Sequence, residues 1–176
     1  DGNGNTSTQT QNIIIDDITS PTPDVANLSV INADCEVTSL TEPTVTDNCG
    51  GMVTVSNNAD LPITTQGTTV ITWTYDDGNG NTTSQTQNVI IDDVTGPTPD
   101  VTTLPDVVAE CDVTTLTPPA ATDNCGGTVT VTNNITLPII GENTTTIVTW
   151  TYDDGNGNTT TQTQNVVIDD ISAPLP

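Results

Sequence analysis

The chain lacks the three basic residue types that many binding and catalytic sites use. It has no Lys, no Arg and no His against 23 Asp plus Glu, so its formal net charge at pH 7 is −23. Without cationic side chains it cannot neutralise a phosphate backbone or bind anionic lipid electrostatically. Histidine general bases, Schiff-base lysines and Lys–Asn isopeptide cross-links are likewise impossible. We therefore expect no nucleic-acid partner, and most enzyme chemistry is excluded.

Aromatic residues and long apolar runs are also scarce. Phe is absent, and two Trp and two Tyr make up the 2% of aromatic residues. No apolar run approaches the length needed to cross a bilayer, so we expect no membrane insertion. A glycosidase needs two acids across a sugar ring, whereas the acids here lie next to each other in predicted turns. We predict that the protein is not an enzyme.

The residues that remain favour strands and turns. Low hydrophobicity with high net charge is typical of disorder. Here, however, the apolar residues gather in β-branched clusters such as 13–15, 89–91 and 166–168, and the abundant Thr is itself a strand former. Trp73 and Tyr75 alternate with threonines, which predicts a strand with one apolar face. The two Trp residues are therefore expected in a core.

A repeat of about 76 residues organises the chain. Asp-Gly-Asn-Gly-Asn occurs at 1–5, 77–81 and 154–158, and the stretch from this motif to Ile-Asp-Asp occurs three times, whereas the rest of the repeat occurs twice. We therefore expect a terminal strand segment, 1–20, followed by two modules, 21–96 and 97–176. The segment is expected to complete a preceding module of a longer array or to insert into a neighbouring chain.

The strand and turn pattern predicts the fold class. Asp-Gly-Asn-Gly directly follows the Trp strand and precedes another strand, as in a hairpin turn that needs positive φ. Short strands, frequent turns and no helical period predict an all-β protein. We expect tandem immunoglobulin-like β-sandwich modules plus an orphan N-terminal strand segment.

Two motifs carry a resemblance to a known family. Thr-Asp-Asn-Cys-Gly-Gly stands at 46–51 and 122–127, and Tyr-Asp-Asp-Gly-Asn-Gly-Asn stands at 75–81 and 152–158. With the repeat, these motifs resemble the hyalin-repeat (HYR) family of immunoglobulin-like modules, which are strung in tandem on extracellular proteins. The sequence around Gln-Thr-Gln-Asn is similar to that of repeat arrays in secreted surface adhesins of Bacteroidetes. The chain departs from the family pattern in having two cysteines per module where four are common.

The resemblance implies an extracellular or cell-surface location and identical neighbouring modules or chains, arranged head-to-tail, as partners. It implies no catalytic residue. In that setting we expect disulfides within each module, Cys35–Cys49 and Cys111–Cys125. Buried free thiols and bridges between chains are the alternatives. A zinc site is not indicated, because no Cys-x-x-Cys and no His is present.

Acidic residues recur at three positions of each repeat: a pair that ends a strand, a pair that opens the hairpin turn, and one residue before the second cysteine. In chain order these are Asp16, Asp17, Asp47, Asp76, Asp77, Asp92, Asp93, Asp123, Asp153 and Asp154. In an immunoglobulin-like module the relevant loops share one end, so clusters from two modules are expected to meet at each junction. No basic side chain is available to offset their repulsion.

Oxygen ligands of this kind suit Ca²⁺, and the Asp-x-Asn-x-Asn spacing resembles the first half of a calcium loop. We predict calcium at the module junctions. The expected ligands at the internal junction are Asp92, Asp93, Asp123, Asp153, Asp154, Asn156 and Asn158, and the first repeat offers Asn79 and Asn81 beside its own aspartates. The alternative is a favourable turn flanked by solvated strand ends.

These inferences predict a structural repeat unit of an extracellular fibre or cell-surface stalk, stiffened by calcium. The alternative is an adhesin module that binds a glycan or a surface directly. A binder of that kind would present an exposed aromatic residue or a variable loop, and the sequence shows neither.

Overall fold

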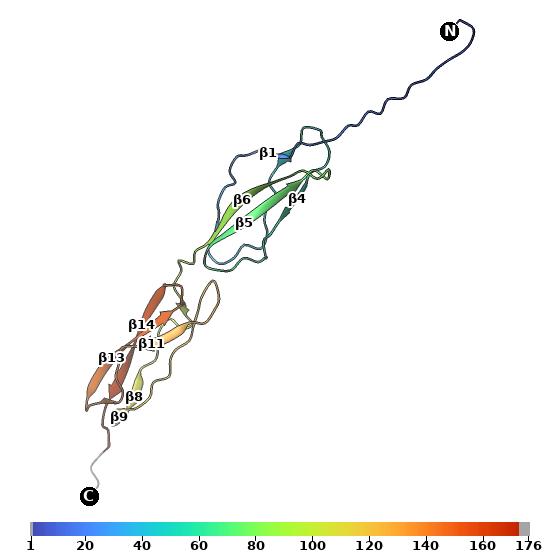
Figure 1. The fold of residues 1–176 in the computed structure, drawn as a ribbon. Coiled ribbons are helices and arrows are strands. Elements are labelled where there is room, and N and C mark those ends of the chain that lie inside the picture. Colours follow the sequence, from blue (N-terminus) through green and yellow to red (C-terminus); the bar gives the residue numbers. More distant parts are fainter. Residues whose placement is uncertain (1, 173–176) are drawn as a thin grey trace. The chain divides into compact units, whose positions relative to one another are not determined.

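The computed structural model describes residues 2–172, and every regular element among them is a β-strand (Figure 1). No helix in this part of the chain could span a membrane. The strands of the first repeat are β1 (Thr22–Pro23), β2 (Ile31–Ala33), β3 (Val45–Thr46), β4 (Thr54–Asn57), β5 (Gly67–Asp76) and β6 (Thr82–Ile91). Those of the second are β7 (Thr98–Pro99), β8 (Val107–Ala109), β9 (Asp112–Val113), β10 (Ala121–Thr122), β11 (Thr130–Asn133), β12 (Ile139–Ile140), β13 (Thr144–Asp153) and β14 (Thr159–Ile168).

Both repeats build the same four-stranded sheet. The strand order is β2-β6-β5-β4 in the first repeat and β8-β14-β13-β11 in the second. β13 and β14 form an antiparallel hairpin over their whole length, from Asp153 opposite Thr159 to Thr144 opposite Ile168. β8 then joins the last residues of β14 in parallel. The predicted hairpin therefore lies where the sequence indicated it.

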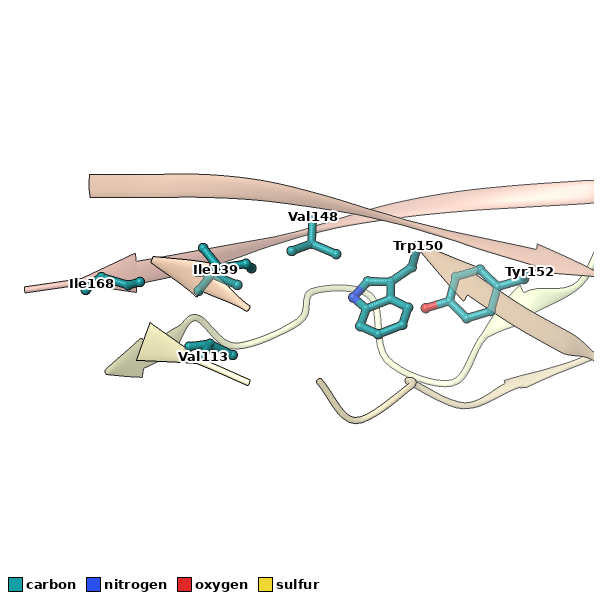
Figure 2. Close-up of a cluster of buried hydrophobic side chains, with 7 residues drawn as sticks. Val113, Ile139, Val148, Trp150, Tyr152 and Ile168 are labelled. Atoms are coloured by element: carbon teal, nitrogen blue, oxygen red, sulfur yellow. The ribbon is translucent and has the colours of Figure 1, made fainter. Parts of the chain in front are cut away.

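Short strands provide the second layer of each module. In the second repeat β7 pairs with β10 and β9 with β12, and in the first β1 pairs with β3. Val113 of β9 and Ile139 of β12 belong to the same buried cluster as Val148, Trp150 and Tyr152 of β13 (Figure 2). Two layers thus enclose one apolar core. The prediction of all-β, immunoglobulin-like modules is confirmed.

The aromatic residues alternate along the longest strands as predicted. Trp150 and Tyr152 are 1% and 0% exposed, and their counterparts Trp73 and Tyr75 are both 0% exposed. Intervening threonines take the opposite face of each strand. All four aromatic side chains of the protein are therefore in the cores.

The glutamines of the Gln-Thr-Gln motif satisfy the polar atoms of these aromatic residues. Trp150 Nε1 donates a hydrogen bond of 3.0 Å to Gln164 Oε1, and Gln164 Nε2 donates one of 2.9 Å to the carbonyl of Pro105. Tyr152 and Gln162 form the same relay to the carbonyl of Val101. Each glutamine ties the main sheet to the segment that follows the linker. Sequence reasoning had assigned no role to these glutamines.

The first repeat contains the same relays. Trp73 donates to Gln87 and Tyr75 to Gln85, and the two glutamines donate to backbone carbonyls of residues 29 and 25. This duplication indicates that the motif is part of the module's architecture.

Residues 2–20 form no strand in the structure. Ile13, Ile14 and Ile15 are 82–95% exposed, whereas Val89 and Ile91, at the corresponding positions of β6, are 0% and 1% exposed. The segment therefore has the sequence of a β6-type strand but no sheet to pair with. Its assignment to a preceding module or a neighbouring chain stays a prediction, and residue 1 lies outside the described part.

Packing divides the chain into two compact units, which are described separately. The first consists of Asp1–Val30, Leu40–Asp60 and Val70–Asn88, and the second of Ile31–Ser39, Leu61–Thr69 and Val89–Pro176. The module limits 21–96 and 97–176 are not tested by this division and stay a prediction. Residues 173–176 of the second module lie outside the described part.

Replacing Gln164 with Leu tests the aromatic–glutamine relay. The change leaves the buried Trp150 N–H and the Pro105 carbonyl without partners, and we expect a loss of about 1–3 kcal/mol in the free energy of unfolding. Chemical denaturation measures it. Gln11→Leu is the matched control, because Gln11 occupies the same motif position in the exposed segment. Equal effects of the two changes would contradict a role for the relay.

Candidate functional site

The linker between the repeats is fixed onto the hairpin turn of the second repeat. Asp93 is 4% exposed, and Pro97 is fully buried. Asn158 Nδ2 donates a hydrogen bond of 2.9 Å to the backbone carbonyl of Asp93, and Asn156 Nδ2 donates one of 3.1 Å to its Oδ2. The Asp93 N–H in turn donates to Gln66 Oε1 at 3.0 Å. Both the side chain and the backbone of Asp93 therefore form specific hydrogen bonds.

The hairpin turn that holds the linker is organised by its own first aspartates. Asp154 Oδ1 accepts from the N–H groups of Asn156 and Asn158 at 2.7 and 3.1 Å, and its Oδ2 accepts from Asn158 Nδ2 at 2.8 Å. Asp153 Oδ1 accepts from the Gly155 N–H at 2.8 Å. Gly155 and Gly157 have φ of 83° and 107°, which favours glycine. These hydrogen bonds fix the positions of Asn156 and Asn158, the two asparagines that donate to Asp93.

The hydrogen bonds of the turn change the pKa of its aspartate. Burial raises the pKa of Asp154, but the bonds from Asn158 and from the backbone of residues 156–158 outweigh it, so this pKa lies below its ordinary value of 3.8. Asp77 has the equivalent bonds and the same downward pKa shift. Both carboxylates therefore favour their charged form as part of the turn.

We call the hydrogen bonds from Asn156 and Asn158 to Asp93 a clamp, and the first unit contains the same arrangement. Asn81 Nδ2 donates to the carbonyl of Asp17 at 3.0 Å, Asn79 Nδ2 donates to Asp17 Oδ2 at 3.4 Å, and Pro21 is fully buried. The turn aspartates Asp76 and Asp77 accept from backbone N–H groups as their counterparts do. The clamp is thus a property of the repeat.

One acidic cluster lies beside each clamp. Ligand-type atoms of Asp93, Asp123 and Cys125 lie within 4.8 Å of one another, and so do those of Asp17, Asp47 and Cys49. The Oδ2 atoms of Asp123 and Asp47 accept from the N–H two residues on, at 2.8 and 3.0 Å. Their Oδ1 atoms are buried and have no hydrogen-bond partner among residues 2–172.

The remaining predicted ligands lie elsewhere. Asp16 and Asp92 are exposed and stand outside both clusters. The four aspartates that open the turns are engaged in the turns themselves: Asp76, Asp77, Asp153 and Asp154. The structure therefore brings together one linker aspartate and one loop aspartate per junction, with the two turn asparagines in contact with the former.

The cysteines form a different disulfide from the one expected. Cys35 is bonded to Cys125, with 4.8 Å between their Cα atoms and a sequence separation of 90. Cys49 and Cys111 are free and exposed. The expectation of a disulfide is confirmed, but the pairing of Cys35 with Cys49 and of Cys111 with Cys125 is wrong. The bond joins the first repeat to the second.

The length of the main strands explains this pairing. Cys111 follows β8, which pairs with the last residues of β14. Cys125 lies with Asp93, which Asn158 holds just before the first residue of β14. Ten strand residues separate these ends by about 30 Å, whereas a disulfide needs Cα atoms less than about 7 Å apart. A short loop in the sequence therefore spans the length of the module.

A signal for the correct pairing was present in the sequence. One cysteine of each repeat follows a short strand, and the other lies in Asp-Asn-Cys-Gly-Gly beside the acids assigned to the junction. Asn124 of this motif contacts both bonded sulfurs, with Nδ2 at 3.6 Å from Cys35 Sγ and 3.4 Å from Cys125 Sγ. If the two cysteines of a repeat are assigned to opposite ends of the module, each can pair only with a cysteine of a neighbouring repeat.

The environment of Cys49 affects its acidity. Desolvation, followed by the hydrogen bond and charge of Asp17 and the charges of Asp47 and Asp77, raises the pKa of the Cys49 thiol. The thiol is therefore kept in its protonated form more than an isolated cysteine would be.

Comparison with known proteins shows what one segment of the chain is similar to. Residues 18–91 match the family described as the HYR-like domain with 4 cysteines. This segment is therefore similar to HYR-like modules. It contains two cysteines, Cys35 and Cys49, where the family's description gives four.

Two curated relatives extend the similarity beyond this segment. Hyalin of Strongylocentrotus purpuratus is 32% identical over 151 residues, which cover 77% of the chain and 12% of that protein. Hyalin of Lytechinus variegatus is 34% identical over 151 residues, covering 77% of the chain and 27% of that protein. The chain thus spans a small part of each relative. Both relatives come from sea urchins, so they do not support the bacterial origin that the repeat wording had suggested.

Solved structures with a similar strand arrangement are more distant. They include human Protocadherin-24 EC1-2 (12% identity, TM-score 0.39, 88% of this chain and 99% of that one) and Sidekick-1 immunoglobulin domains 1–5 (12% identity, TM-score 0.40, 85% and 39%). An endo-fucoidan hydrolase of glycoside hydrolase family 107 also matches at 16% identity and a TM-score of 0.40, covering 86% of this chain and 29% of that one. Similarity at this level carries no argument about function.

Replacing Asp154 with Asn tests the role of the turn carboxylate. Because the folded pKa of Asp154 is lowered, its contribution to stability is complete above the ordinary value of 3.8 and is lost as the pH falls through the folded pKa. We expect the variant to melt a few degrees below the wild type at pH 7, with the difference shrinking towards pH 2. Calorimetry over pH 2–7 measures it. Asp112→Asn, at an exposed strand position, is the control, and a difference that does not change with pH would contradict the prediction.

Proposed function

We propose that the chain is a structural repeat unit of an extracellular fibre or cell-surface stalk, with neighbouring modules as its partners. The observation that carries this proposal is the Cys35–Cys125 bond between consecutive repeats. A bond inside a module stabilises that module alone, whereas a bond between repeats resists their separation. A bond of the second kind would limit the extension of the linker when an array is under load.

The composition supports an extracellular setting. Stable disulfides belong to oxidising compartments. The absence of Lys and Arg leaves trypsin-like proteases without a cleavage site, and the charge of −23 keeps neighbouring copies from associating nonspecifically. The similarity to hyalin and to the HYR-like family is consistent with an adhesion-type repeat module outside the cell.

Burial of the aromatic residues argues against direct glycan binding. Protein surfaces that bind sugars commonly use an exposed aromatic ring, and Trp73, Trp150, Tyr75 and Tyr152 are all buried. Phe is absent from the sequence. The structural role is therefore favoured over the adhesin that binds a glycan or surface itself.

Calcium at the junctions is part of the proposal. The side chains at the junction offer the oxygen ligands that Ca²⁺ prefers: Asp93 and Asp123 have carboxylates, and Asn156 and Asn158 have side-chain amides. The Asp123 Oδ1 atom is buried without a partner, which is costly for a carboxylate in a chain that has no basic side chain. The corresponding set in the first repeat is Asp17, Asp47, Asn79 and Asn81. The turn aspartates are not needed as ligands.

A bound divalent cation would supply the positive charge that the sequence lacks. The protein's own part is to hold the linker aspartate with the two turn asparagines and to fix the loop aspartate through the backbone N–H beyond it. With the disulfide on the same loop, the linker would lose most of its freedom. An array of such junctions would be stiff.

Calorimetric titration of the full chain with calcium tests this part. We expect measurable heat and a higher Tm, with stabilisation of about 2.7 kcal/mol for each site when free calcium is 100 times the Kd. The double variant Asp47→Asn/Asp123→Asn should lose both responses. Asp60→Asn/Asp112→Asn is the matched control, because it removes the same charge from exposed positions outside the clusters.

Small-angle scattering of the same samples provides a second readout. The distribution of maximum dimensions should be narrow with calcium and broader after chelation. No heat together with an unchanged Tm would contradict the calcium sites, and the repeat-unit role would then depend on the disulfide. An unchanged distribution after both chelation and reduction would contradict the stiff junction itself.

A further inference from the structure

Two cysteines of the chain have no bond although their repeat counterparts do. Cys111 corresponds to Cys35 and Cys49 corresponds to Cys125, because each pair is 76 residues apart. Cys35 and Cys125 form the disulfide, while Cys49 and Cys111 are free and exposed.

Cys49 has the setting of Cys125. Its N–H donates to Asp47 Oδ2 at 3.0 Å, as that of Cys125 donates to Asp123 Oδ2 at 2.8 Å. Cys49 lies with Asp17 and Asp47 within 4.8 Å, as Cys125 lies with Asp93 and Asp123. The loop that holds one half of the known disulfide is therefore already formed around Cys49.

Cys111 has the setting of Cys35. Each lies two residues beyond a short strand, β8 or β2, that pairs in parallel with the end of a long strand. The Asp169 N–H donates to the Ala109 carbonyl at 3.0 Å, and the Asp92 N–H donates to the Ala33 carbonyl at 3.0 Å. The strand end that presents the other half of the disulfide is thus formed before Cys111 as well.

We propose that Cys111 forms a disulfide with Cys49 of the next copy of the HYR-like array, so that each junction carries one bridge of the Cys35–Cys125 type. The inference rests on the proposed role as a repeat unit. It gives the array a direction, because the first cysteine of one repeat always bonds the second cysteine of the repeat that follows. A second copy of this chain supplies the required partner.

The N-terminal segment supports this direction. Asp17 of the same segment lies beside Cys49, so this cysteine belongs to the end of the module that faces a predecessor.

The bond forms by thiol–disulfide exchange with a small-molecule disulfide such as oxidised glutathione. The Cys111 thiolate attacks one sulfur of the oxidant and releases one glutathione thiolate. The Cys49 thiolate of the second copy then attacks the mixed disulfide and releases the other. Two protein thiols are oxidised to one disulfide, and one oxidised glutathione is reduced to two thiols.

Complementary variants test the pairing. Cys49→Ser leaves only Cys111 free, and Cys111→Ser leaves only Cys49 free. We expect their equimolar mixture in a glutathione redox buffer to give a disulfide-linked dimer at least about tenfold in excess of the dimer from either variant alone, equivalent to about 1.4 kcal/mol. Non-reducing electrophoresis measures the yield, and mass spectrometry of linked peptides identifies Cys111–Cys49. The wild type should give a ladder.

The variant Cys49→Ser/Cys111→Ser is the control and should stay monomeric with Cys35–Cys125 intact. Equal dimer yields from the single variants and their mixture, or a mixture that stays monomeric, would overturn the proposal. If either of these results is obtained while the control keeps its Cys35–Cys125 bond, the inference fails and the repeat-unit function stands. If Cys35–Cys125 itself does not form, both fail.

Discussion

Carboxylates in this protein have no basic side chain to pair with, and this constraint governs the structure at the module junctions. An acid drawn out of water must find N–H donors or a cation, because an unpaired buried charge is very costly. Asp93 obtains its donors from Asn156 and Thr95. Asp154 obtains them from its own turn. The abundance of Asn and Gly beside Asp follows from this need for neutral donors.

The same residues serve both the module and its connection to the next. The hairpin turn closes the two longest strands of the sheet, and its asparagines grip the incoming linker. The adjacent loop carries the second cysteine and an aspartate with one unpartnered oxygen. Folding of a module therefore prepares the surface that receives its predecessor. An array built on this principle can lengthen by adding repeats, since each repeat brings its own receiving surface.

Strands, turns and core were accessible from the sequence because each follows from a local pattern. Alternation placed Trp73 and Trp150 in the cores, and Asp-Gly-Asn-Gly marked the hairpins. The acidic site was accessible only in part. The position of each aspartate in the repeat predicted that Asp93 lies near Asp123. It did not predict that the Asp154 carboxylate accepts hydrogen bonds from its own turn, because those bonds depend on backbone geometry.

The disulfide escaped prediction for a related reason. Spacing of Cys35 and Cys49 along the chain favoured closing a short loop, whereas the strands carry the two residues to opposite ends of the module. The glutamines were missed because Gln is usually a surface residue. The pairing of β13 with β14 places Gln164 opposite Val148, from where it reaches the diagonal neighbour Trp150. The disulfide and the glutamine hydrogen bonds therefore depend on strand pairing between distant parts of the chain, which a local sequence pattern does not show.

A map of the disulfides in the unreduced protein tests the central claim most directly. Free thiols are blocked with an alkylating reagent, the chain is cleaved at its aspartates, and linked peptides are identified by mass spectrometry. The account predicts one peptide pair joining Cys35 to Cys125, with alkylated Cys49 and Cys111 in the monomer. Peptides joining Cys35 to Cys49 and Cys111 to Cys125 would contradict it.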